Sequence, residues 1–463
     1  MSYINKDFLL ENETAKELYH NNCENLPIID YHCHLDPMAI AEDKKFRNIT
    51  ELWLGGDHYK WRLIRACGVP ENEITGDASD YTKFLRFASI MPRIVGNPMY
   101  QWTHLELKKY FDYDGLLSEE TAEEVWELCN KKLETLTARQ MMKMSGVVAV
   151  ATTDDPIDSL EAHRMIAADP ECDIVVNPTW RPDKAVNIDK AGFGEYIAKL
   201  SEVSGIEIDG IDALMQALVN RLEFFKENGC RACDHGLDFV PYAETTQAEV
   251  DAIFKKALKG ESIDGCEAEK FKFYVLNKLH IEYSRLGWIS QLHYGALRNV
   301  NTNKFALLGP DTGYDCIGNC GDPVKIASFL NSLEKENKLP KTILYSLNPN
   351  DNNMLVSLMN SFQNDDCRGK LQHGSAWWFN DTYTGMVNQL TALAEDGILG
   401  NFIGMLTDSR SFISYPRHDL FRRLLCNLVG EWAESGKFPN DTKMLGKLVA
   451  DVSYYNCKEY FNY

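Results

Sequence analysis

Two histidines, His32 and His34, follow a short apolar run near the start of the chain. The run covers residues 26–30, with the sequence LPIID, and Cys33 separates the two histidines. Side chains at positions i and i+2 of an extended strand point to the same side, so both imidazoles can approach one cation. The spacing alone is a weak signal, because such a pair arises by chance in roughly a quarter of chains with this histidine content. Further ligands are needed to support a metal site.

Polar residues also follow other short apolar runs of the chain. His293 follows the run at 288–292, and Asp408 follows the run at 402–406. Imidazole and carboxylate groups are ligands of zinc and of other divalent transition ions. We predict that His32, His34, His293 and Asp408 bind one divalent ion and leave coordination positions for water or substrate. Zn²⁺ is the favoured ion, with Mn²⁺, Ni²⁺ and Co²⁺ as alternatives.

The elements that must position these residues are eight short β-rich runs separated by helical stretches. Amphipathic segments with helical spacing lie between the runs, for example at 119–137, 211–228 and 246–258. Alternating strands and helices imply parallel strands with crossovers, and eight such units fit a (β/α)8 barrel. The predicted strands are 27–31, 146–151, 172–176, 229–232, 288–292, 342–345, 370–372 and 402–406.

Two gaps between the predicted strands are too long for a simple crossover. We expect a mainly helical insertion at 35–145, after strand 1, and a second one at 177–228, after strand 3. Barrel enzymes build their sites on the face where these insertions would lie. No linker or repeat divides the chain, so residues 1–463 are expected to form a single α/β domain, an elaborated TIM-type barrel.

The composition of the chain argues against several classes of binding partner. A formal net charge of −20 argues against nucleic acid and anionic membranes, because phosphate binding needs a concentrated basic face. No stretch approaches the roughly 18 apolar residues of a membrane span, and residues 1–25 lack the pattern of a secretory signal. The 13 cysteines are scattered, which indicates reduced thiols, although the pairs Cys230/Cys233 and Cys316/Cys320 leave a redox or zinc role open. We expect a cytoplasmic protein that acts on a small molecule.

Longer sequence strings add a family resemblance. A histidine pair after strand 1, a histidine after strand 5 and an aspartate after strand 8 resemble the amidohydrolase superfamily, and the strings resemble the uronate (glucuronate) isomerase family within it. The resemblance covers nearly the whole chain. The strings are HYKWRLIRACGV (58–69), TTDDPID (152–158), NPTWRPDK (177–184), CDHGL (233–237), QLHYGALRNVN (291–301), LGPDTGYD (308–315), SLNPNDN (346–352), GSAWWFND (374–381) and MLTDSRSFISYPRHD (405–419).

The resemblance implies an aldose–ketose isomerase that interconverts D-glucuronate and D-fructuronate, and D-galacturonate and D-tagaturonate. Such a reaction moves a proton between C2 and C1 through an enediol, and it requires stabilisation of the charge that develops on oxygen. The resemblance also implies a hexuronate as the small-molecule partner. We further expect a homo-oligomer.

The resemblance assigns roles to particular residues. Tyr59 and His58 match an active-site His-Tyr pair, and Tyr59 is the first choice of base, because a tyrosine near cationic groups could ionise. Asp408 would touch the metal and shuttle a hydroxyl proton, while Arg410 would stabilise the tyrosinate or the enediolate. Substrate-binding roles fall to Arg181, Asp234, Arg298 and Trp377.

Several alternatives stay open on the sequence alone. Arg298 could instead hold the loop after strand 5 through an ion pair, and Trp377 could be a core residue. Asp154 and Asp155 precede a proline and favour a structural role over a catalytic one. The second candidate function is metal-dependent hydrolysis, and a third is a noncatalytic sugar-acid binding protein.

Overall fold

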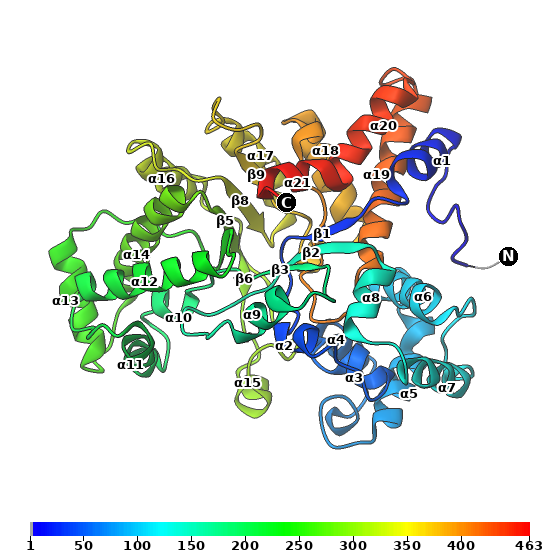
Figure 1. The fold of residues 1–463 in the computed structure, drawn as a ribbon, viewed down its shortest axis with the longest axis horizontal. Helices are drawn as coiled ribbons and strands as arrows, with labels where there is room; N and C mark the ends of the chain where they lie inside the picture. Colours follow the sequence, from blue (N-terminus) through cyan, green and yellow to red (C-terminus); the bar gives the residue numbers. More distant parts are fainter. Residues whose placement is uncertain (1–2) are drawn as a thin grey trace.

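A computed structural model describes residues 3–463 of the chain (Figure 1). Seven of the eight predicted runs form parallel strands, and isolated bridges from Trp180 to Asp154 and to Cys233 link their two sheets into one curved wall. The order around the wall is β1-β2-β3 and then β4-β5-β8-β9. The strands are β1 (Ile28–Asp30), β2 (Val147–Ala151), β3 (Val175–Asn177), β4 (Ala232–Gly236), β5 (Ile289–Tyr294), β8 (Thr342–Ser346) and β9 (Leu371–His373).

The eighth run, residues 402–406, closes the barrel without forming a ladder-paired strand. It lies beside β1, where the Tyr31 hydroxyl donates a 2.9 Å hydrogen bond to the Gly404 carbonyl. Ile403 joins the inner apolar core, which combines small and branched side chains of the barrel wall with aromatic rings. The members of this core from the wall include Ile29, Ala149, Ala232, Ile289 and Ile343. The fold is therefore the predicted α/β barrel, with one wall segment held by its side chains and by isolated hydrogen bonds.

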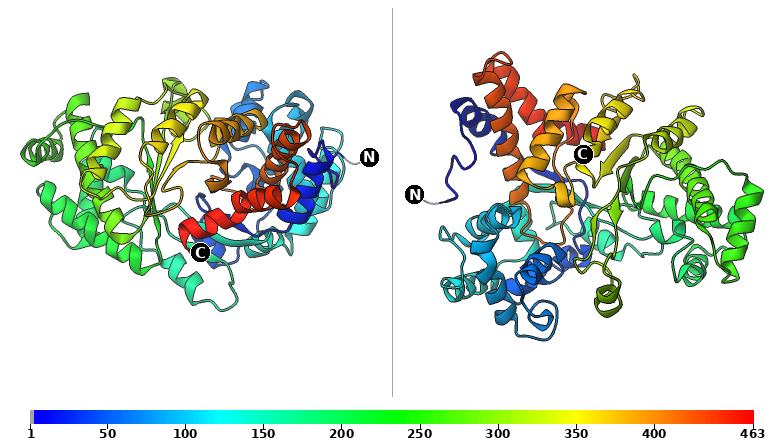
Figure 2. Two further views of the ribbon diagram at one scale, coloured as in Figure 1. Left: turned by 90° about the horizontal axis from the view of Figure 1, so that it is seen from above. Right: turned by 180° about the vertical axis from the view of Figure 1, so that it is seen from behind.

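Helices surround this wall unevenly, and Figure 2 shows the blue and cyan helices after β1 at one side and the green helices after β3 and β4 at the other. The helices after β1 are α2 (Pro37–Ala41), α3 (Ile49–Leu54), α4 (His58–Ala66), α5 (Asp80–Ile90), α6 (Pro98–Phe111), α7 (Ala122–Leu133) and α8 (Ala138–Met144). α9 (Glu161–Ala168) follows β2. The helices after β3 and β4 are α10 (Asp183–Val186), α11 (Phe193–Ser204), α12 (Ile211–Glu227), α13 (Gln247–Leu258) and α14 (Gly265–Leu286).

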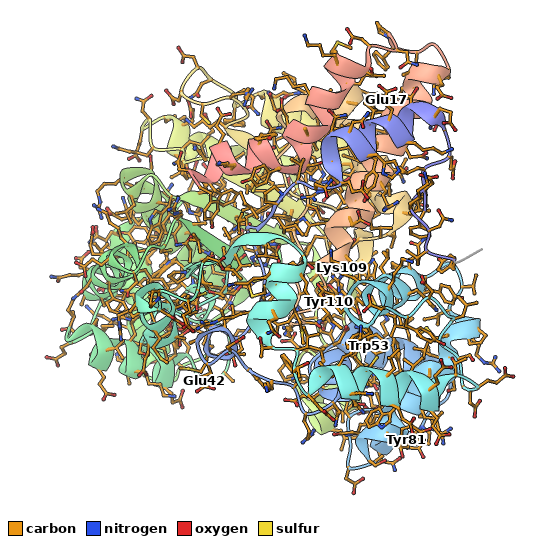
Figure 3. All side chains as sticks on the ribbon, turned by 45° about the vertical axis from the view of Figure 1, so that its right-hand side comes forward. Glu17, Glu42, Trp53, Tyr81, Lys109 and Tyr110 are labelled. Carbon is orange, nitrogen blue, oxygen red and sulfur yellow. The ribbon has the colours of Figure 1, made fainter. Side chains whose placement is uncertain are left out.

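The helices after β1 have an apolar core of their own, which is continuous with β1 and β2. Trp53 of α3 and Tyr110 of α6, labelled in Figure 3, are almost fully buried in this part of the molecule. Side-chain caps define where several of these helices begin: Asn48 caps α3, Asp57 caps α4, and Asn97 followed by Pro98 starts α6.

The remaining helices follow β5 and later strands, except α1, which precedes β1. A short antiparallel hairpin, β6 (Ala296–Leu297) with β7 (Cys316–Ile317), carries α15 (Thr302–Leu308), which has no buried residue. The other helices are α1 (Glu13–Leu18), α16 (Pro323–Glu334), α17 (Asn352–Asn360), α18 (Tyr383–Glu395), α19 (Pro416–Glu434), α20 (Thr442–Ala450) and α21 (Asn456–Phe461). No helix within residues 3–463 is long and apolar enough to cross a membrane.

Candidate active site

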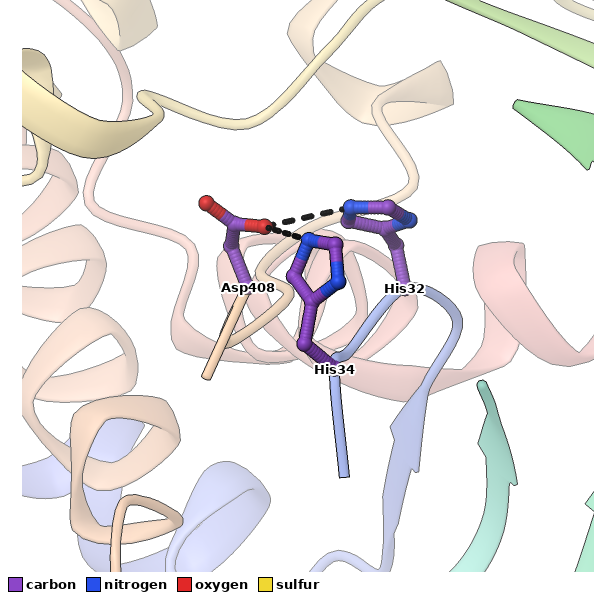
Figure 4. Close-up of side chains that lie close together, drawn as sticks. All are labelled: His32, His34 and Asp408. Atoms are coloured by element: carbon purple, nitrogen blue, oxygen red, sulfur yellow. Dashed lines mark hydrogen bonds and ion pairs between the residues drawn. The ribbon is translucent and has the colours of Figure 1, made fainter. Parts of the chain in front are cut away.

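Three of the predicted metal ligands meet at the mouth of the barrel. His32 Nε2 lies 3.1 Å and His34 Nε2 lies 3.2 Å from the same oxygen of Asp408, Oδ1 (Figure 4). The histidines follow β1, and Asp408 follows the wall segment that runs beside β1. Two imidazoles and one carboxylate within 4.8 Å of one another could hold a metal ion.

The backbone holds Asp408 in an unusual conformation. Its φ is +48°, in the left-handed region, which costs a residue other than glycine of order 1–3 kcal/mol. The amide of Asp408 donates a 3.2 Å hydrogen bond to the carbonyl of His32. Its neighbour Thr407 is also fixed, because its amide and hydroxyl both donate to the buried carboxylate of Asp30. Left-handed backbone that the surrounding structure enforces is frequent at functional sites.

His293 belongs to a second group of side chains, with His32 and Asp234. His293 Nδ1 lies 2.6 Å from Asp234 Oδ1, and the rings of His293 and His32 lie 4.8 Å apart. His32 therefore stands between two clusters, and the four predicted ligands do not share a single cluster. His293 also stacks on Tyr345, with 4.1 Å between ring centroids, and any side chain in place of Gly374 would overlap this tyrosine ring.

Arg181, for which substrate binding is predicted, is paired with a carboxylate of the protein. Its Nε lies 2.8 Å from Asp234 Oδ2, and Asp234 is completely buried. Burial alone would raise the pKa of Asp234, but Arg181 and His293 hold it well below its usual range. Asp234 lies inside β4, because this strand begins three residues later than predicted. Arg181 therefore stabilises the buried carboxylate of Asp234, in addition to any role in substrate binding.

The second oxygen of Asp408 accepts a 2.8 Å hydrogen bond from Trp377 Nε1. Burial opposes ionisation of Asp408, but the hydrogen bonds of His32 and His34 hold the pKa of this carboxyl well below its usual range. Burial lowers the pKa of His34 to about 4, so this imidazole is neutral at neutral pH, the state that a metal requires. Trp377 is buried and touches the ring of His293, so it is both a core residue and a partner of the site.

Tyr59 and His58 open helix α4 beside this cluster. The Asp57 side chain caps the helix and accepts hydrogen bonds from the amides of Tyr59 and Lys60, which fixes the first turn. Burial and then the Asp408 carboxylate raise the pKa of Tyr59 well above its usual value, so the phenol is protonated at neutral pH, and its role as the base stays a prediction. Burial and then Arg410 lower the pKa of His58, which is a neutral base at neutral pH.

A cavity of about 360 Å³ lies at this part of the barrel mouth, and its volume is within the size range of small-ligand sites. Its lining includes His34, His58, Tyr59, Asp408 and Arg410. The Arg410 side chain is 40% exposed, and its nearest carboxylate, that of Asp311, lies 3.9 Å away. Arg410 is therefore the cation of the site with the most freedom to meet an anionic substrate.

Arg298 lies apart from this cavity, on the hairpin side of the site. Its guanidinium lies 4.9 Å from the ring centroid of Trp378, and Nη1 pairs with Asp315 at 3.1 Å and with Asp311 at 3.3 Å. This geometry matches the loop-holding alternative for Arg298. Asp154 likewise has structural contacts, since its carboxylate accepts hydrogen bonds from Thr152 and from the Thr179 amide.

Two residues of the site region were not singled out from the sequence. Arg417 lines the 360 Å³ cavity from the first turn of α19, and Asp381, which follows the short helical turn Trp378–Asn380, lies 3.6 Å from Arg417 Nη1. Asp381 is the last residue of the string GSAWWFND, and Arg417 is the third residue from the end of MLTDSRSFISYPRHD. Arg417 lies in the polar run 417–419 at the start of α19, and a hydrophobic pattern treats such a run as a surface position.

A barrel of parallel strands, with paired histidines after β1 and an aspartate after the closing segment 402–406, defines the chain as an α/β-barrel enzyme with a candidate divalent-metal site. The family model described as glucuronate isomerase matches residues 1–461. The chain belongs to the glucuronate isomerase family.

Individual relatives are similar over their full lengths. A uronate isomerase of Lachnoclostridium phytofermentans is 52% identical over 100% of this chain and 99% of its own length. A uronate isomerase of Caldicellulosiruptor saccharolyticus is 53% identical, again over 100% of this chain and 99% of its own length. The crystal structure of uronate isomerase from Thermotoga maritima superposes with a TM-score of 0.94 at 38% identity, and covers 100% of both chains.

Proposed function

We propose that this enzyme interconverts an aldohexuronate and a ketohexuronate, as D-glucuronate with D-fructuronate and D-galacturonate with D-tagaturonate. The observation that carries the proposal is the convergence of Asp408, Tyr59, His58 and Arg410 on one cavity, in a chain of the glucuronate isomerase family. The cavity offers a carboxylate, a phenol, a neutral imidazole and a partly exposed guanidinium. These are the groups that a proton transfer next to a carbonyl requires.

Arg410 is proposed to stabilise negative charge on the substrate. A chain with a net charge of −20 must concentrate cations locally to bind an acidic sugar. Arg410 is partly exposed and lacks a close carboxylate partner, so it can form hydrogen bonds to a carboxylate or to the enediolate oxygen. Arg181, paired with Asp234, is proposed to bind the substrate with its remaining N–H groups, and Arg298 and Trp377 are proposed to border the bound sugar.

Tyr59 is proposed to move the proton between C2 and C1. Because the phenol is protonated in the resting protein, it must transfer its proton before it can act as a base. The neutral imidazole of His58 is the adjacent acceptor, with 4.8 Å between the two ring centroids. Asp408, oriented by Trp377, is proposed to exchange the hydroxyl proton of the substrate.

The donor set fits a divalent transition ion. His32 and His34 approach one oxygen of Asp408, and His293 Nε2 is buried without a hydrogen-bond partner in the described part of the chain. We propose that His32, His34 and Asp408 hold one ion, with His293 as the fourth candidate, and that the ion is Zn²⁺, with Mn²⁺, Ni²⁺ or Co²⁺ as substitutes. When bound, the ion would supply Lewis-acid polarisation of a substrate oxygen.

The test is a product assay on the purified, metal-loaded protein. D-glucuronate and D-galacturonate should each convert to a ketose of the same mass, with an equilibrium reached from either side, as followed by NMR. Hydrolysis, the second candidate, would instead release a fragment and incorporate solvent oxygen. Saturable binding of hexuronates without any turnover would support a binding protein and refute the isomerase.

The organisation of the chain is also part of the proposal. We propose one barrel domain with helical insertions at 35–145 and 177–228, supported by the apolar core that joins the helices after β1 to β1 and β2.

Exposed apolar side chains on the β6–β7 hairpin and the helix that it carries, such as Leu297 and Leu307, support a homo-oligomer. The 13 free cysteines support a cytoplasmic location.

A further inference from the structure

Arg417 occupies a central place beside the site, although the reaction as proposed does not use it. It is the second residue of α19 and only 4% exposed. The centre of its guanidinium lies 3.6 Å from the ring centroid of Trp102 in α6, a stacked cation–π contact. Its Nη1 donates a 3.0 Å hydrogen bond to the carbonyl of Thr407. One side chain thus joins α19, α6 and the segment that carries Asp408.

The hydrogen bond from Arg417 to the Thr407 carbonyl constrains the backbone at Asp408. The Thr407 carbonyl and the Asp408 amide belong to the same peptide plane, and that amide donates to the His32 carbonyl. Arg417 and His32 therefore hold this plane from its two edges. Rotation of the plane changes φ of Asp408, which is +48°. This left-handed conformation is unfavourable for a residue with a Cβ atom, so contacts with other residues must maintain it. The direction of the Asp408 carboxylate depends on this torsion.

Asp381 in turn faces Arg417. Its Oδ2 lies 3.6 Å from Arg417 Nη1, and both side chains are about 95% buried. Within residues 3–463, Asp381 Oδ1 and Arg417 Nε have no hydrogen-bond partner. A buried guanidinium with one backbone acceptor needs a counter-charge to remain in place. Burial raises the pKa of the Asp381 carboxyl to about 7, and Arg417 opposes this rise, so the guanidinium favours the ionised carboxylate that balances its own charge. The Asp381 carboxylate therefore holds in place the guanidinium that donates to the Thr407 carbonyl.

We propose that Arg417 is a positioning residue for the candidate site: it fixes the peptide plane between Thr407 and Asp408, Asp381 fixes Arg417, and together they direct the Asp408 carboxylate toward the proposed metal and substrate positions. This inference rests on the proposed role of Asp408. Groups that orient a ligand from behind typically change metal affinity or activity by about 10- to 100-fold when they are removed.

The experiment compares Arg417→Lys with Arg422→Lys. Arg422 is the matched control, because it lies on the same helix, is equally buried, and donates to the backbone carbonyls of Leu26 and Pro27, remote from the cavity. Chelator-stripped protein is titrated with Zn²⁺ against a chromogenic chelator, in the absence of substrate. Turnover of glucuronate is measured separately, with kcat and KM resolved, at a temperature well below each variant's Tm.

Arg417→Lys keeps the charge but cannot both stack on Trp102 and reach the Thr407 carbonyl. We expect its Zn²⁺ dissociation constant to rise about 10-fold or more and its kcat to fall about 10- to 100-fold, with KM within about threefold. Arg422→Lys should lower Tm and leave the Zn²⁺ affinity and kcat within about twofold. Equal losses in both arginine variants, or an unchanged Zn²⁺ affinity in Arg417→Lys, would overturn the proposal.

Asp381→Asn covers the case in which Arg417→Lys does not fold. It preserves side-chain volume and removes the counter-charge, so the same two losses should appear in weaker form, and normal affinity and kcat would refute the role of the pair. The Zn²⁺ titration does not depend on the substrate. An inactive wild type that binds Zn²⁺ normally would refute the proposed function alone, and the titration of the variants would still decide the positioning role.

Discussion

The pairing of Arg181 with Asp234 makes a prediction about stability that differs from that of a simple substrate-binding arginine. Arg181→Met leaves a fully buried carboxylate without the guanidinium that lies 2.8 Å from it. Removing one member of a buried pair costs about 3–5 kcal/mol, and we take about 3 kcal/mol because the Arg181 side chain is 25% exposed. At about 2.1 cal/mol/K per residue, the unfolding entropy of 463 residues is about 1 kcal/mol/K, so Tm should fall by about 3 °C.

Scanning calorimetry across pH measures this loss. The folded pKa of Asp234 is depressed, so its contribution is present above the unfolded pKa and is lost as pH falls through the folded pKa. Removing Arg181 raises the folded pKa, so the difference from wild type should be full at neutral pH and shrink in acid. Arg285→Met is the control, because its partners Glu223 and Glu282 form a surface cluster, and it should change Tm by less than about 1 °C.

A second variant isolates the uncompensated charge. Asp234→Asn introduced together with Arg181→Met should recover part of the lost Tm, because no buried carboxylate remains. Wild-type Tm in the Arg181→Met single variant would refute the reasoning, and so would a double variant that is less stable than the sum of the two single losses.

Three further predictions concern the site and its surroundings. Tyr59→Phe should lower kcat by about 10²- to 10⁴-fold in the isomerase assay, with metal content unchanged by elemental analysis; wild-type turnover would move the base to His58 or Asp408. Arg410→Met should lose turnover in the same assay while Tm stays within about 1 °C by calorimetry, because this side chain is 40% exposed and has no close ion pair; a large loss of Tm would contradict a substrate role. Burial raises the pKa of Asp154 from 3.8 to about 7, so the folded state retains a proton that the unfolded state releases, and stability falls as pH rises from about 4 to 7. Asp154→Asn should flatten this part of the Tm–pH curve by up to about 4 °C, and an unchanged slope would contradict the buried carboxyl as its source.

The sequence predicts the barrel better than it predicts the exact strands. Seven apolar runs became parallel strands, since a run that is buried on both faces has few other stable arrangements. β4 was placed too early because its central residues, Asp234 and His235, are buried polar groups that a hydrophobic pattern reads as a loop. The β6–β7 hairpin with α15 was missed because its apolar residues are exposed and show no period.

The candidate site was predictable in its residue types and only partly in its pairings. His32, His34 and Asp408 meet because β1 and the closing segment 402–406 run side by side and bring their following residues to the same end of the barrel. The partnership of His293 with Asp234, and that of Asp234 with Arg181, depends on side-chain directions across the barrel, which spacing along the chain does not encode. The raised pKa of Tyr59 likewise depends on burial and on the Asp408 carboxylate, and the ring that stacks on Tyr59, that of Trp378, is distant in sequence.

The contact between His32 and Asp408 spans 376 positions of the chain. Closing so long a loop has a high entropic cost, and chains dominated by such distant contacts fold slowly. Helices and most of the wall can form while this closure is still missing. In refolding from denaturant, far-ultraviolet ellipticity should therefore recover before catalytic activity does, and a folding intermediate would hold the histidine pair without its carboxylate. Because the contact between His32 and Asp408 is expected to form late, catalytic activity indicates that folding is complete.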